Sequence, residues 1–171
     1  MEKTFEQQEN AVREKFITMF NSNFKSIIPV EYLFSHYDLD CITNNNIHKY
    51  IELKERGEAY SLTEYHYRAI IEEEKIEFFK EVWQNSPEIQ CLYFNFFYDG
   101  FICYNITNRI IEKENNHSSV ALNTYTRKNM PDRTINGISY INKNVCDLRA
   151  SKERFGDFAR VYYSKDLELF N

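Results

Sequence analysis

The stretch that decides the fold is YDLDCITNNNIHKYIELK, residues 37–54 of the chain. Within it, residues 37–42 and 48–55 alternate apolar and polar side chains, which is the pattern of half-buried strands. The three asparagines at 44–46 lie between them and favour a turn, because asparagine tolerates left-handed backbone conformations. The stretch therefore predicts two neighbouring strands joined by an Asn-rich turn.

The two predicted strands each have an apolar face and a charged face, since successive side chains of a strand point to opposite sides of the sheet. The apolar set is Leu39, Cys41, Ile51 and Leu53, and the charged set is Asp38, Asp40, Glu52 and Lys54. If the strands pair, carboxylates and a lysine converge on one face. We expect a helix to cover that face, and charges buried beneath a helix need a partner or a metal ion.

Helical patterns flank this pair of strands. Apolar residues at helical spacing predict one amphipathic helix over residues 4–22 and a second over 62–84. Pro29 blocks continuation of the first helix, and residues 30–34 are expected to be extended.

A hairpin is expected after the second helix. Residues 89–97 and 100–107 are rich in Tyr, Phe, Ile and Cys, and Asp99-Gly100 between them is a strong hairpin signal. The order of elements predicts an α/β fold with a mixed β-sheet flanked by helices. We expect a single domain over residues 1–171.

The C-terminal part of the chain is basic. Its weaker patterns favour strands near 119–126 and 158–163 and a helix near 147–155. Residues 127–165 hold nine Lys or Arg and four Asp or Glu, although the whole chain has a net charge of −5. A basic segment on an acidic body suits contact with a polyanion such as nucleic acid. The candidate phosphate contacts are Arg127, Lys128 and Arg133.

Composition excludes several classes of protein. The chain has 171 residues, of which 43% are hydrophobic and 27% charged, and this excludes a disordered or collagen-like chain. No stretch approaches the ~18 apolar residues of a membrane span, and the charged N-terminus does not fit a signal peptide. The four cysteines lack the spacing of a zinc site, so reduced thiols and a cytoplasmic location are expected.

The predicted cluster of carboxylates favours a metal site. Two carboxylates that point at one place repel each other unless a cation lies between them, and oxygen ligands suit Mg²⁺ or Mn²⁺. Such an ion lowers the pKa of a bound water and stabilises charge on a phosphoryl oxygen. Lys54 could orient that water or offset charge on the phosphate. An alternative is a transition-metal site built from His36, Asp38 and Asp40, which would also share a face.

The same residues resemble the PD-(D/E)xK, or restriction-endonuclease-like, superfamily of nucleases. Its signature is an Asp on one strand and (D/E)xK on the next. Glu52-Leu53-Lys54 matches the second half of the signature, and Asp38 best matches the lone Asp, with Asp40 as the alternative. The resemblance extends over about residues 5–107 to the order of elements, and it implies an α-βββ-α-β core.

The resemblance also implies which residues form the site. Family members often carry a glutamate on the preceding helix that completes the metal site. Glu9 is the residue that fits best, with Glu6 and Glu14 as alternatives, and Glu64 is a further candidate beyond the ExK strand. Tyr37 stands where the signature has proline. The implied catalytic residues are Asp38, Glu52 and Lys54, and the implied metal ligands are Asp38, Glu52 and Glu9.

The implied activity is hydrolysis of phosphodiester bonds by a Mg²⁺- or Mn²⁺-dependent nuclease, an endo- or exodeoxyribonuclease. The expected partner is nucleic acid, with DNA favoured, and many such nucleases cut two strands as homodimers. One alternative is a catalytically inactive nuclease-fold protein that binds nucleic acid or a protein partner. A second is a structural α/β protein in which Glu52 and Lys54 form an ion pair on an exposed face.

Overall fold

The structure is a computed structural model. It describes residues 5–31, 35–56, 61–63, 68–108, 110, 124–126, 134–135, 138–139, 144–149 and 159–163.

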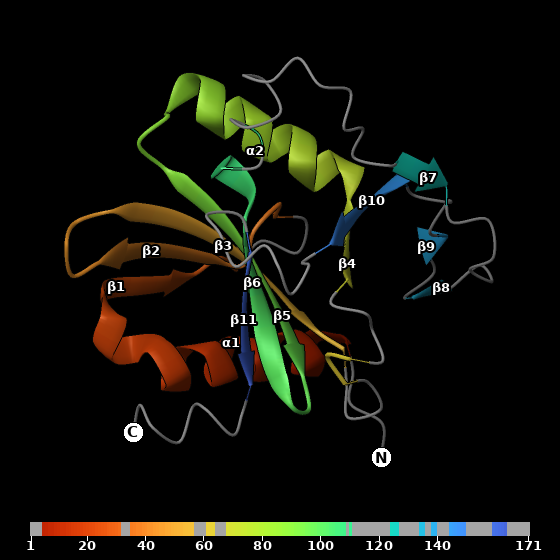
Figure 1. Cartoon of the computed structure of the whole chain (residues 1–171), viewed down its shortest axis with the longest axis horizontal. Helices are drawn as coiled ribbons and strands as arrows, with labels where there is room; N and C mark the ends of the chain where they lie inside the picture. Colours follow the sequence, from red (N-terminus) through yellow and green to blue (C-terminus); the bar gives the residue numbers. More distant parts are fainter. Residues whose placement is uncertain are drawn as a thin grey trace.

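A six-stranded mixed sheet lies at the centre of the fold (Figure 1). In spatial order its strands are β1 (Phe24–Pro29), β2 (Leu39–Thr43), β3 (His48–Glu55), β5 (Gln90–Phe97), β6 (Gly100–Asn105) and β11 (Ala159–Tyr163). The neighbours β3 and β5 run parallel, and the other neighbouring pairs run antiparallel. The parallel pair needs a crossover, which contains the second helix.

One face of the sheet is covered by α1 (Phe5–Phe20), which ends in the short 3₁₀ helix η1 (Asn21–Asn23). In Figure 1 this helix runs along the lower side of the sheet. Val12 and Phe16 are buried against the sheet, and the Phe16 ring meets Phe94 edge-on at 5.0 Å between centroids. The strand residues of this core are Leu39, Cys41, Ile51, Leu53, Leu92, Phe94, Phe96 and Phe101. They include the whole apolar set predicted for strands 37–42 and 48–55.

The opposite face is covered by α2 (Glu73–Asn85), which buries Ile76 and Phe79. The core beneath it takes buried side chains from β5 and β6, among them Tyr93 and Tyr104. Glu52 points to this face, because it lies two residues from Tyr50 on β3 and so shares its side of the sheet, and Tyr50 packs against the same core. Among the described residues, no helix is long and apolar enough to cross a membrane.

The predicted fold class is confirmed. The chain forms a mixed sheet between helices. Apart from β4 (Arg68–Glu72), which precedes α2 and belongs to another sheet, α1, β1–β3, α2 and β5 follow the expected α-βββ-α-β order. The first strand lies earlier than predicted: β1 ends at Pro29, whereas residues 30–34 were expected to be extended. Proline is tolerated here because β1 is an edge strand, where a missing N–H breaks no ladder on the open side.

The prediction of a helix over 62–84 is wrong in its first part. Residues Arg68–Glu72 form a strand, β4, and α2 begins only at Glu73. The strand forms because it pairs with β10 (Asn144–Arg149), in the register Ile71 to Cys146. A partner more than 70 residues away leaves no trace in local periodicity. Acidic residues at Glu73 and Glu74 suit the positive end of the helix dipole.

A second, smaller sheet lies beside α2, with β4 paired to β10 and β10 paired to β7 (Thr124–Thr126). The helix expected near 147–155 is therefore wrong at 147–149, which belong to β10, and the rest of that range lies outside the described residues. The strand expected near 158–163 is confirmed as β11. The strand expected near 119–126 is confirmed at Thr124–Thr126, which form β7, and residues 119–123 lie outside the described residues. Two short strands, β8 (Thr134–Ile135) and β9 (Ile138–Ser139), pair with each other.

The hairpin predicted at Asp99-Gly100 is confirmed between β5 and β6. Gly100 has a φ of 155°, and a Cβ atom there would lie 2.0 Å from the backbone oxygen of Tyr162. Only glycine lets β11 approach this closely. The Asp99 side chain also accepts a hydrogen bond from the Leu62 N–H at 2.9 Å, which ties the crossover to the hairpin.

Candidate functional site

Asp38 lies at the point where β2 and β3 part. The paired residues of these strands end at Leu39 and Ile51, one residue beyond Asp38. The Asp38 backbone is bonded on both sides, by its N–H to the Ile51 oxygen and by its oxygen to the Val30 N–H, each at 2.9 Å. Beyond the last backbone hydrogen bond between the strands, the Asp38 side chain bonds to β3 instead: Oδ2 accepts the Leu53 N–H at 2.8 Å. These contacts fix the carboxylate beside the second half of β3.

The carboxylate of Glu52 is buried under α2, where it contacts the ammonium group of Lys75. Burial raises the pKa of Glu52 to about 8; Lys75 opposes this rise, and the neighbouring Asp38 adds to it. Burial also works against the charge of Lys75, but Glu52 and Glu72 outweigh it and raise the pKa of that ammonium group. Lys75 therefore stays protonated, and Glu52 is the member of the pair that titrates.

A third carboxyl group, that of Glu9 on α1, lies near enough to Asp38 to be influenced by it. Burial raises the pKa of Glu9, and Asp38 raises it further, while Arg13, Lys75 and Lys54 oppose the shift. Arg13, one helical turn further on, donates from Nη2 to Asp38 Oδ1 at 2.9 Å. The pair is well buried, with 16% of the Arg13 side chain and 13% of the Asp38 side chain exposed.

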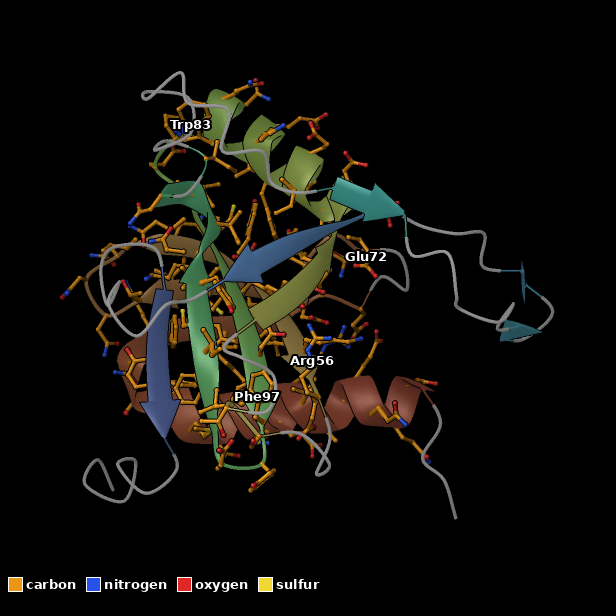
Figure 2. The ribbon with its side chains drawn as sticks, turned by 45° about the vertical axis from the view of Figure 1, so that its right-hand side comes forward. Arg56, Glu72, Trp83 and Phe97 are labelled. Carbon is orange, nitrogen blue, oxygen red and sulfur yellow. The ribbon has the colours of Figure 1, made fainter. Side chains whose placement is uncertain are left out.

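Lys54 projects from the same face of β3 as Glu52, two residues further along, and its side chain is exposed. It lies close enough to Glu9 to lower the pKa of that carboxyl group. The next residue on this face is Arg56, whose Nε donates to Asn95 Oδ1 at 2.9 Å. Figure 2 shows Arg56 and Glu72 on two sides of a group of charged side chains near this end of the sheet.

The structure separates Asp38 from its alternative, Asp40. The Asp40 carboxylate contacts His48 Nε2 at 2.6 Å, whereas Asp38 acts on the pKa of Glu52. The alternative site of His36, Asp38 and Asp40 does not form either. The His36 ring stacks on Phe78 at 4.8 Å between centroids instead.

The glutamates of α1 also differ from one another in their surroundings. Glu9 is half-buried and lies near the charged side chains of Asp38 and Arg13, while Glu6 and Glu14 are exposed. Glu64, the further candidate on the crossover, lies outside the described residues.

The three candidate phosphate contacts, Arg127, Lys128 and Arg133, lie outside the described residues. Part of the basic segment is described, however, because it forms β10. This strand pairs with β4 so that Val145 stands opposite Glu72, whose carboxylate lies 3.6 Å from Lys75 Nζ. The backbone of the basic segment therefore passes close to Glu72 and its partner Lys75.

The donor set fits Mg²⁺ or Mn²⁺, since Glu9, Asp38 and Glu52 offer carboxylate oxygens on three elements. The electrostatics fit too, because Asp38 raises the pKa of both glutamates. Within the described ranges, however, no three His, Cys, Asp or Glu residues are gathered closely enough to hold an ion. Two of the acids are already paired with cations of the chain, since Arg13 contacts Asp38 and Lys75 contacts Glu52.

Sequence reasoning missed both of these cations. Arg13 could have been found, because it follows Glu9 by one helical turn and so shares its face. Lys75 could not, because the sequence predicted it in the middle of a longer helix, 62–84, and gave no reason for it to face the sheet. Buried polar atoms mark the region as well: Arg13 Nε and Asn95 Nδ2 have no hydrogen-bond partner among the residues that the structure describes.

Comparison with protein-family models finds no match, and comparison with curated proteins finds none either. Among solved structures, the chain is similar to Hjc, a Holliday junction resolvase from the archaeal hyperthermophile Archaeoglobus fulgidus. The TM-score is 0.43 and the sequence identity 13%, over 58% of this chain and 73% of that one. The function of this chain therefore has to be inferred from the side chains of its own site.

Proposed function

We propose that this protein is a metal-dependent nuclease that hydrolyses phosphodiester bonds of nucleic acid, an endo- or exodeoxyribonuclease. Glu9, Asp38 and Glu52 would hold Mg²⁺ or Mn²⁺, and Lys54 would act on the water or the phosphate.

One observation carries this proposal: the Asp38 carboxylate, held just before β2 where its pairing with β3 ends, raises the pKa of both Glu9 on α1 and Glu52 on β3. A structural ion-pair network has no need of an acid that lies near enough to two others to raise their pKa values. Removing one buried acid from water is costly, and grouping several adds repulsion to that cost. A site that collects a cation explains both features.

In such a site a divalent ion would supply a more acidic bound water and stabilise charge on the phosphate. The chain's own residues do the rest. The Asp38 side chain is fixed by the Leu53 N–H, and this presents one carboxylate in a constant orientation. Lys54, exposed beside the acids, can orient the attacking water and offset negative charge on the phosphate as the phosphorus–oxygen bond breaks.

The test is incubation of the purified protein with plasmid, linear duplex and single-stranded DNA, each with Mg²⁺, Mn²⁺ or EDTA. Single-stranded RNA is included to define the sugar preference. Cleavage with either metal and none with EDTA is the expected result. Absence of cleavage on every substrate, in protein shown to be folded, would contradict the proposal.

Metal binding should depend on pH through Glu52. Its carboxyl group keeps its proton up to a pKa of about 8, and a metal ion binds only the ionised form. Mg²⁺ affinity is therefore expected to rise by about tenfold per pH unit below that pKa and to level off above it. Calorimetric titration in buffers of different ionisation enthalpy measures both the affinity and the protons released. Affinity that stays flat from acid to alkaline pH would show that Glu52 is not a ligand.

The basic segment should bind the backbone of the nucleic acid. Replacing Arg127, Lys128 and Arg133 by Gln is expected to weaken binding without changing metal affinity. Each lost phosphate contact should reduce the slope of log affinity against log salt by about 0.9 on duplex DNA and about 0.7 on single strands. Binding titrations at several salt concentrations, with Ca²⁺ in place of Mg²⁺, measure this slope. An unchanged slope in the triple variant would leave the segment as an ordinary solvated surface.

A second candidate function is binding of nucleic acid without cleavage. It is favoured by the ion pairs of Asp38 with Arg13 and of Glu52 with Lys75, which together could neutralise the acids permanently. In that case the protein would bind nucleic acid equally well with EDTA, and neither Mg²⁺ nor Mn²⁺ would bind at Glu52.

A further inference from the structure

Lys75 occupies an unusual position for a lysine. It is the third residue of α2, yet its side chain turns from the helix into the sheet and contacts Glu52. The Lys75 side chain is 17% exposed and that of Glu52 is 9% exposed, so this is a buried pair. A buried carboxylate needs a cation, and here the chain supplies one of its own.

Lys75 also has a second partner, further out. Glu72, the residue immediately before α2, places Oε2 3.6 Å from Lys75 Nζ, and its side chain is 40% exposed. The two acids therefore lie on the inner and outer sides of one ammonium group. A rotation of the flexible lysine side chain would exchange the buried partner for the exposed one without leaving the charge unpaired.

We infer that Lys75 is a resident cation of the site, which holds Glu52 in the metal-free protein and is displaced towards Glu72 when a divalent ion binds. This inference rests on the proposed function, since it takes Glu52 as a metal ligand. An ammonium group and a divalent ion at one carboxylate repel each other strongly in a region shielded from water. Binding of the ion and contact with Lys75 therefore exclude one another at this position.

The contact between Lys75 and Glu52 explains why the described acids are not gathered into a coordination shell in this structure. While Lys75 remains on Glu52, the ammonium group of Lys75 occupies that carboxylate. Metal affinity is then reduced by the fraction of molecules in which Lys75 has moved away. Lys75 thus positions Glu52 and tunes the metal concentration at which the site fills.

The experiment follows the ammonium group of Lys75 by NMR in the wild-type protein, with ¹⁵N-labelled lysine, during titration with Mg²⁺. A buried, hydrogen-bonded ammonium group exchanges its protons slowly, so Lys75 should give a separate signal in the metal-free protein. The signal is assigned by its absence from Lys75→Arg. Calorimetry on the same sample reports whether metal binds, and Glu52→Gln reports whether it binds at Glu52.

The expected result is that the Lys75 signal shifts or exchanges away in proportion to the metal bound at Glu52. Lys80, on the same helix and paired with Glu77 at 2.6 Å on the surface, is the matched control and should not respond. An unchanged Lys75 signal with metal bound at Glu52 would overturn this inference and leave the proposed function standing. If no metal binds at Glu52 even at millimolar Mg²⁺, both the inference and the metal-dependent function fail.

Discussion

Glu52→Gln is expected to abolish cleavage and to lower Mn²⁺ affinity by more than about 100-fold. Loss of an outer hydrogen-bond partner of a metal ligand already costs about 10- to 100-fold in affinity, so loss of the ligand's own charge should cost more. Gln keeps the size of the side chain and an oxygen that accepts from Lys75. The measurements are Mn²⁺ binding by electron paramagnetic resonance and cleavage of labelled DNA.

The matched control for this variant is Glu55→Gln. Glu55 lies at the end of the same strand, but its side chain is 41% exposed and pairs with Lys15 at 2.9 Å. This control should bind metal and cleave as the wild type does. Wild-type activity in Glu52→Gln would contradict the assignment of the metal site, whatever the control does.

Lys54→Ala is expected to separate chemistry from metal binding. Lysine is not a ligand for Mg²⁺ or Mn²⁺, so metal affinity should stay within a few fold of wild type. Cleavage should fall by about 100- to 1,000-fold, the usual effect of removing one group that stabilises charge in a transition state. Single-turnover cleavage at saturating metal measures the loss directly.

Lys25→Ala provides the comparison for this variant. Lys25 lies on the edge strand β1, and its ammonium group contacts the turn residue Asn46 at 3.4 Å. Its removal deletes one surface charge of the same kind away from the acids. If Lys54→Ala cleaves as fast as Lys25→Ala, then Lys54 has no role in the reaction.

Much of the fold could be predicted because strand alternation is a local rule. Leu39 and Ile51 are fully buried beneath α1, and Glu52 lies on the opposite face beneath α2, as the period of two requires. The same rule predicted that Asp38 lies on the strand next to Glu52 and on the same face of the sheet. The hairpin at Asp99-Gly100 could also be predicted from the sequence, since its signal lies in two adjacent residues.

What could not be predicted depends on contacts between distant parts of the chain. The strand β4 forms only because β10 pairs with it, and its sequence, Arg68–Glu72, continues into a real helix without a break in composition. The misplaced start of the helix hid Lys75, because nothing in the sequence indicates that a residue in the middle of a helix faces Glu52. The choice between Asp38 and Asp40 was open for a similar reason: it depends on where the pairing of β2 and β3 ends.

The most direct measurement of the central claim is an X-ray structure of crystals grown with Mn²⁺, with data collected to reveal its anomalous signal. We expect one strong peak bonded to carboxylate oxygens of Asp38 and Glu52, with Glu9 facing the ion directly or through water, and Lys75 moved away from Glu52. A structure at saturating Mn²⁺ in which this place is empty, with Arg13 still on Asp38 and Lys75 still on Glu52, would contradict the proposed metal site.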